Sequence, residues 1–218
     1  TATLGNKVET ISTTASEYGN GFKDIVSNEG VSEVQLATSD GRVTMYGVAM
    51  ETKRGSTWET FGVAGSSVRS MRNQPQNHIV KQVEARDPQL IVYWTGGNEL
   101  GYPSLKSKTG KAYKKLYRTA IEKLKSGAPN ASCLLISPLD QGVRERGRIV
   151  SKKTLKNIIR FQTEVAQSMG CAYWNAREAM GGEGAIKRWR HHKPALASGD
   201  LAHLTRKGRA LIGESLAD

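Results

Sequence analysis

Between residues 75 and 216, short apolar runs alternate with runs of helical periodicity, and this alternation most constrains the fold. Residues 90–94 and 134–136 are apolar throughout, which is typical of strands that helices cover on both faces. In residues 111–125 the apolar side chains recur at spacings of three and four, which predicts an amphipathic helix. Helical runs at 75–85, 152–169 and 205–216, and a short strand at 172–174, continue the pattern. The sequence therefore predicts a three-layer α/β domain with a parallel sheet.

The first 41 residues differ in character from the rest of the chain. They are rich in Thr, Ser, Gly and Asn and contain only short alternating runs, which predict small β-strands. A turn signal at residues 39–42 is followed by a stronger strand pattern at 43–50. We therefore expect a β-rich segment over residues 1–41 and the α/β domain over residues 42–218.

The chain is strongly basic, with 32 Lys and Arg against 20 Asp and Glu and a net charge of +12. Such an excess raises the local concentration of anionic partners, whether nucleic acid, anionic lipid or an acidic cell-wall polymer. The sign of the charge does not choose among these partners. No apolar run approaches the roughly 18 residues that a membrane span requires, and the first residues do not resemble a signal peptide. The two cysteines, Cys133 and Cys171, do not indicate a disulfide framework.

Two clusters of polar residues follow the pattern of an active site at the carboxyl ends of parallel strands. The first, residues 95–99, follows the apolar run at 90–94 and combines two glycines with the side-chain amide of Asn98. The second places Asp200 three residues before His203, on a loop that leads into the last helix. A carboxylate at this spacing orients the imidazole through Nδ1 and leaves Nε2 free to act as a base. This is the arrangement that nucleophilic catalysis by serine requires.

An Asp-x-x-His near the C-terminus, preceded about a hundred residues earlier by Gly-x-Asn after an apolar strand, resembles the SGNH (GDSL-type) hydrolases. A third block, residues 61–67, lies where that family has an oxyanion glycine, and Gly65 is its best counterpart. The resemblance implies that His203 is the base, that Asp200 orients it, and that Gly65 and Asn98 are the oxyanion donors. It also implies a flavodoxin-like fold.

The stretch from Gly181 to Trp189 further resembles bacterial members of the family that remove acyl groups from cell-wall glycans. The resemblance implies a serine esterase acting on O-acyl groups, in particular O-acetyl groups, of a bacterial cell-wall or surface polysaccharide in the periplasm or outside the cell. Gly97, Glu99, Arg188 and Trp189 are the expected substrate-binding residues. No cofactor, metal or nucleic-acid partner is implied. The basic stretch at 187–193 is expected to line the rim of the active-site cleft.

One block of the family, the Gly-Asp-Ser that carries the nucleophile, occurs nowhere in the sequence. In the doubly wound topology this strand lies centrally, so we expect a strand from an upstream segment of the protein to lie between residues 43–50 and 90–94. Residues 1–41 would then end an inserted, carbohydrate-binding-like module. Ser66 or Ser67 as a replacement nucleophile is the less favoured interpretation. A non-catalytic, glycan-binding relative is the alternative function.

Overall fold

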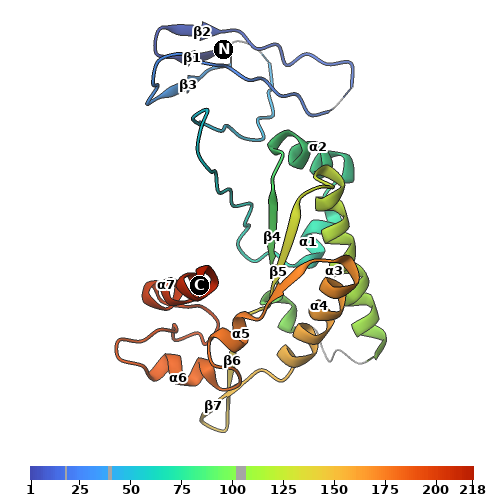
Figure 1. Cartoon of the computed structure of the whole chain (residues 1–218), viewed down its shortest axis with the longest axis vertical. Helices are drawn as coiled ribbons and strands as arrows, with labels where there is room; N and C mark the ends of the chain where they lie inside the picture. Colours follow the sequence, from blue (N-terminus) through green and yellow to red (C-terminus); the bar gives the residue numbers. More distant parts are fainter. Residues whose placement is uncertain (18, 39–40, 102–106) are drawn as a thin grey trace. The chain divides into compact units, whose positions relative to one another are not determined.

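The computed structural model describes residues 1–17, 19–38, 41–101 and 107–218. The chain forms two compact units, residues 1–61 and residues 62–218, which are described separately (Figure 1). The predicted turn at residues 39–42 lies partly outside the described residues. The units divide at residues 61/62, and residues 42–61 form no regular helix or strand. The boundary at 41/42 stays a prediction.

The first unit contains a small antiparallel sheet in the order β2-β1-β3. Its strands are β1 (Ala2–Leu4), β2 (Lys7–Glu9) and β3 (Val34–Leu36). The central strand buries Ala2, which is 1% exposed. Short strands are therefore present where the alternating runs predicted them. Their assignment to an inserted carbohydrate-binding module stays a prediction.

The strand predicted at residues 43–50 is not formed. These residues have no regular secondary structure, and the apolar side chains of Val43, Met45, Val48 and Met50 are exposed. The alternation of apolar residues is that of a strand, but an extended segment becomes part of a sheet only when a neighbour satisfies its backbone groups. No described strand pairs with this segment.

The second unit is built on a parallel sheet in the order β4-β5-β8. The strands are β4 (Leu90–Trp94), β5 (Ser132–Ile136) and β8 (Ala172–Trp174). The register aligns Tyr93, Leu135 and Tyr173, so these three side chains share one face of the sheet. The predicted α/β class with a parallel sheet is confirmed.

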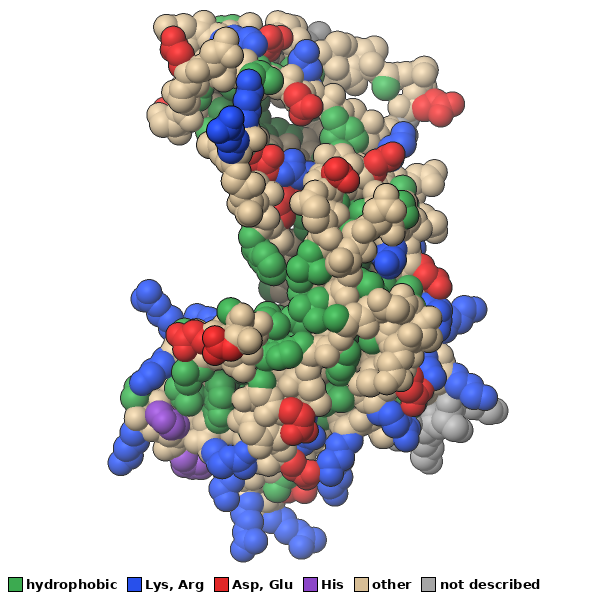
Figure 2. Space-filling model, in the orientation of Figure 1, with side chains coloured by type: hydrophobic (Ala, Val, Ile, Leu, Met, Phe, Trp, Pro, Cys, Tyr) green, Lys and Arg blue, Asp and Glu red, His purple; other side chains and the backbone are tan. Residues whose placement is uncertain are grey.

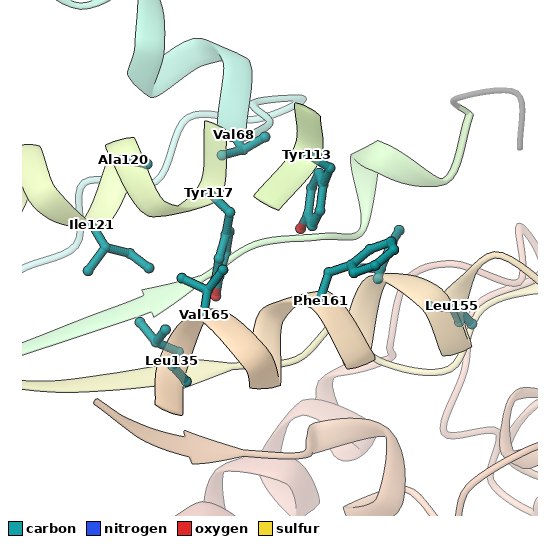
Figure 3. Packing of buried hydrophobic residues seen from close by; sticks show 11 residues of the cluster. Val68, Tyr113, Tyr117, Ala120, Ile121, Leu135, Leu155, Phe161 and Val165 are labelled. Carbon is teal, nitrogen blue, oxygen red and sulfur yellow. The ribbon is translucent and has the colours of Figure 1, made fainter. Parts of the chain in front are cut away.

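Helices α1, α3 and α4 cover that face. The helices of this unit are α1 (Val68–Asn73), α2 (Gln76–Arg86), α3 (Ser107–Gly127), α4 (Leu155–Met169), α5 (Ala176–Ala179), α6 (Ala185–His191) and α7 (Arg206–Ala217), with a 3-10 turn at Asn98–Gly101. Figure 3 shows Tyr117 of α3 and Val165 of α4 packed near Leu135 of β5, and all three side chains are almost fully buried. Burial of each such side chain stabilises the folded state by about 1.5–3 kcal/mol, so this cluster is a core of the unit.

A β-hairpin absent from the sequence prediction follows β5. Its strands, β6 (Gly142–Glu145) and β7 (Arg148–Ser151), pair antiparallel. The hairpin packs on α6 and contributes Ile149 to a second hydrophobic cluster, which also contains Ile186, Leu201 and Leu204. The second cluster therefore supports the loop that carries Asp200 and His203.

Cys133 and Cys171 form a disulfide, contrary to the expectation from the sequence. Cys133 lies on β5 and Cys171 immediately precedes β8, the strand beside it. The two Cα atoms are 4.9 Å apart, within the range for a disulfide. Two cysteines 38 residues apart carry no pairing signal of their own, since only the adjacency of the strands brings them together.

Candidate active site

Asp200 and His203 form a hydrogen-bonded pair on the loop before α7. The Nδ1 atom of His203 lies 2.6 Å from Oδ2 of Asp200. The other carboxylate oxygen, Oδ1, accepts the backbone N–H groups of Ala202 and His203, both at 3.0 Å. The His203 side chain is 81% exposed, so its Nε2 faces solvent and is accessible to a substrate. The predicted spacing therefore produces the geometry of a base and its orienting carboxylate.

The hydrogen bonds to Asp200 also set its ionisation. The backbone N–H groups of His203 and Ala202, followed by the His203 ring, lower the pKa of the Asp200 carboxyl to about 2, against about 3.9 for an ordinary Asp. We expect an NMR titration of the Asp200 carboxyl carbon to give a value near 2. The stabilisation that this carboxylate contributes is present above a pH of about 4 and is lost as the pH falls towards 2. A measured value near 4 would contradict the observed bonding.

Leu201, inside the Asp200–His203 loop, has an unusual backbone conformation. Its φ is 60°, in the left-handed region that non-glycine residues rarely adopt. Its side chain is 4% exposed, and its carbonyl accepts the Gly142 N–H at 2.8 Å. Burial and this hydrogen bond hold the loop in the conformation that brings the two side chains together.

The structure also brings together Asn98 and the loop that contains Gly65. The Asn98 side-chain amide donates to the Ser66 carbonyl at 2.7 Å. An amide nitrogen carries two hydrogens, so Asn98 retains a second donor. Gly65 is exposed and has a φ of 75°, which favours glycine at this turn. The two predicted oxyanion residues are therefore neighbours, as their proposed roles require.

The backbone conformation and close contacts of Gly96, the first glycine of the loop after β4, require glycine at this position. Its φ is 119°, and an added Cβ would lie 2.9 Å from Nε2 of Gln162 and 3.0 Å from Cδ of Pro138. The same Gln162 nitrogen donates to the Thr95 carbonyl at 3.0 Å. Gln162 therefore supports this loop from α4, a role that its position on a helix did not reveal in the sequence.

Glu99, predicted to bind substrate, lies inside the protein and is 1% exposed. Its Oε1 accepts the Val68 N–H at 2.7 Å and the Thr95 hydroxyl at 3.3 Å. Glu99 therefore ties the start of α1 to the Asn98 loop and does not face a substrate. Gly97 is half-buried in the same loop, where its carbonyl accepts the Gln141 side chain.

The two substrate-binding residues predicted on α6 are also engaged within the protein. The Arg188 guanidinium donates to the carbonyls of Gly181, at 2.6 Å, and Glu183, at 3.3 Å. Trp189 is half-buried and packs against the second hydrophobic cluster. Both residues therefore stabilise α6 and the loop before it. A shallow hollow of about 540 Å³ beside them is lined by Gly184, Lys187, Arg188 and His191.

Gln141 and Gly142, which the sequence did not single out, connect the two halves of the site. The Gln141 side-chain amide donates to the Gly97 carbonyl at 3.4 Å, and the Gly142 N–H donates to the Leu201 carbonyl at 2.8 Å. Lys152 donates to the Gln141 side-chain oxygen at 3.2 Å. This dipeptide therefore contacts both the Asn98 loop and the Asp200–His203 loop.

Ser67 does not have the environment of a nucleophile. Its hydroxyl accepts the Arg69 N–H at 3.3 Å and caps α1, while its own N–H donates to the Ser70 hydroxyl at 3.2 Å. The Ser66 carbonyl is engaged by Asn98. Nowhere in residues 1–17, 19–38, 41–101 and 107–218 do three His, Cys, Asp or Glu side chains gather as a metal site would require.

The parallel sheet, the Asp-His pair before α7 and the asparagine loop after β4 have the arrangement that the resemblance to the SGNH family implied. The chain belongs to the GDSL-like lipase/acylhydrolase family, whose model matches residues 13–211. The match begins within the segment predicted to end an inserted module.

Two solved structures show the same fold. A peptidoglycan O-acetylesterase is 19% identical with a TM-score of 0.61, and the alignment covers 71% of this chain and 43% of that one. A catalytic mutant of an acetylxylan esterase from Geobacillus stearothermophilus is 16% identical with a TM-score of 0.50, covering 70% and 66% respectively. The chain thus spans less than half of the first protein and about two thirds of the second. No curated protein sequence matches the chain.

Proposed function

We propose that this chain provides the base and the oxyanion donors of a serine esterase that removes O-acyl groups, in particular O-acetyl groups, from a polysaccharide. The observation that carries the proposal is the 2.6 Å contact between His203 Nδ1 and Asp200 Oδ2, which leaves Nε2 open. Membership of the GDSL-like family supports it. The two similar structures are a peptidoglycan O-acetylesterase and an acetylxylan esterase, which supports the choice of an acetylated polysaccharide as substrate.

The proposed reaction is acyl transfer through a covalent intermediate. A serine hydroxyl attacks the ester carbonyl while His203 Nε2 takes its proton, and the Gly65 N–H and the Asn98 amide bind the oxyanion. Collapse of the tetrahedral intermediate breaks the bond to the sugar oxygen, which receives the proton from His203. Water then attacks the acyl-serine with the same base, releasing the carboxylic acid and restoring the serine.

The serine is proposed to come from an upstream segment that adds a strand along β4. Three observations support this. No Gly-Asp-Ser occurs in the sequence, and among the described strands β4 pairs with β5 alone. In addition, Oε2 of the buried Glu99 has no hydrogen-bond partner among the described residues, although buried carboxylate oxygens are normally bonded. An added segment would supply both the missing neighbour and a donor.

The periplasm or the exterior of a bacterial cell is the proposed location. The Cys133–Cys171 disulfide supports it, because disulfides persist in oxidising compartments. Among the described helices, none has the length and apolar character needed to cross a membrane.

The proposal is tested with the 218-residue chain and p-nitrophenyl acetate. We expect no turnover above background from this chain, because its base and oxyanion donors have no serine to serve. Addition of the upstream segment is expected to restore turnover, and an upstream segment without a serine would instead favour a non-catalytic glycan-binding protein. Turnover by the chain alone that disappears on Ser66→Ala or Ser67→Ala would contradict the upstream nucleophile.

A further inference from the structure

The positive charge of the chain resides in the unit that carries the site. Residues 1–61 contain five Lys and Arg against eight Asp and Glu, whereas residues 62–218 contain 27 against 12. The excess of positive charge therefore belongs to residues 62–218 alone. Figure 2 shows Lys and Arg side chains gathered at the end of this unit where Figure 1 places β6 and β7.

The β6–β7 hairpin concentrates this charge. Arg144, Arg146 and Arg148 are exposed around its tip, and Lys153 is exposed just beyond it. Among the described residues, none of these four cations has an ion pair or hydrogen bond. Glu145 is the single acid of the hairpin. Three guanidinium groups thus face solvent without a partner in the protein.

Hydrogen bonds hold the two ends of the hairpin against residues around the proposed site. The Gly142 N–H donates to the carbonyl of Leu201, within the Asp200–His203 loop, at 2.8 Å. At the other strand, the Ser151 hydroxyl donates to Asp140 at 2.7 Å and accepts the Gly184 N–H at 2.8 Å. Asp140 is fully buried and is paired with Arg177 at 3.0 Å. The exposed cations therefore lie on a hairpin whose two ends are held by hydrogen bonds, one of them to the Asp200–His203 loop.

We propose that the β6–β7 hairpin is a docking surface for a carboxylate-bearing polysaccharide, which it holds beside His203. The inference rests on the proposed function for the nature of the polymer. Guanidinium groups bind carboxylates through paired, planar hydrogen bonds. Attraction by unpaired surface cations raises the local concentration of an anionic chain. A polymer bound to the β6–β7 hairpin would present its esters repeatedly to the site without dissociating.

Binding by the 218-residue chain tests this inference without any turnover. The probes are polygalacturonate, neutral dextran, poly(glycerol phosphate) and single-stranded DNA, each measured by calorimetry. The test variant is Arg146→Asn with Arg148→Gln, in which Asn suits the left-handed φ of 48° at residue 146. The matched control is Lys111→Gln with Lys115→Gln, which removes the same charge from exposed positions of α3, a helix that packs on α1, α2 and α4.

The unmodified chain is expected to bind polygalacturonate and not dextran. The hairpin variant is expected to raise the Kd for polygalacturonate about fivefold at low ionic strength, against less than twofold for the α3 control. The difference should shrink near physiological salt, where the Debye length is about 8 Å.

If the hairpin variant and the α3 control weakened polygalacturonate binding equally, the inference would be overturned in favour of a general charge effect. Tighter binding of poly(glycerol phosphate) or DNA than of polygalacturonate would overturn the assignment of a carboxylate polymer. Failure of the proposed esterase is seen separately, as absent turnover by the chain joined to its upstream segment while polymer binding persists.

Discussion

Replacing His203 with alanine is expected to lower kcat on the order of 10³-fold or more in the chain joined to its upstream serine, with KM nearly unchanged. The base acts chiefly on the transition state, so its loss raises the barrier without weakening substrate binding. The geometry of the pair, with Nδ1 on Asp200 and an exposed ring, supports the proposed role of His203 as the base. The measurement is steady-state kinetics on p-nitrophenyl acetate and on an acetylated polysaccharide.

Further variants separate this chemistry from a structural effect. Asp200→Asn should keep the fold but lower kcat by about 10²- to 10⁴-fold, because an amide favours the wrong imidazole tautomer. The double variant, His203→Ala with Asp200→Asn, should have a kcat only slightly lower than that of His203→Ala alone, since the two residues act as a unit. His78→Ala, on α2, is the matched histidine control and should retain activity. Retention of activity within about threefold by His203→Ala would remove the assignment to serine-esterase chemistry.

Replacing Arg177 with leucine is expected to lower the free energy of unfolding by about 3–5 kcal/mol, the usual cost of breaking a buried ion pair from one side. The Arg177 side chain is 5% exposed, and its Nε lies 3.0 Å from the fully buried Asp140 carboxylate. Asp140 also accepts the Ile186 N–H at 3.0 Å and the Ser151 hydroxyl at 2.7 Å. Loss of Arg177 leaves a buried charge at the point where the hairpin and α6 meet. Urea unfolding measures the effect.

Two companion variants test the cause. Lys156→Leu breaks the exposed pair with Glu183 and should leave the free energy of unfolding nearly unchanged, because solvent screens the two charges. Arg177→Leu combined with Asp140→Asn removes both charges, keeps an acceptor oxygen for the Ile186 N–H and the Ser151 hydroxyl, and should recover part of the lost stability. If the double variant were less stable than Arg177→Leu, the unpaired carboxylate would not be the cause of the destabilisation.

The strands at 90–94 and 172–174 and the stripe of α3 follow from apolar patterning, which local sequence carries directly. The Asp200–His203 pair was predictable for the same reason, because a spacing of three residues on one loop suffices for contact. The absence of a strand at residues 43–50 could not be predicted from the apolar pattern, because a strand also requires a neighbouring strand.

The sequence by itself thus determined the α/β class and the contact between Asp200 and His203. Only the tertiary structure decided that Glu99 is buried, that Arg188 donates to the carbonyls of the loop before α6, that Cys133 pairs with Cys171, and that Gln141 contacts the Asn98 loop. The physical reason is the range of the interactions. Periodicity and short spacings act between near neighbours in the chain, whereas burial, disulfide pairing and bridging hydrogen bonds depend on elements that the parallel crossovers bring together from tens of residues away.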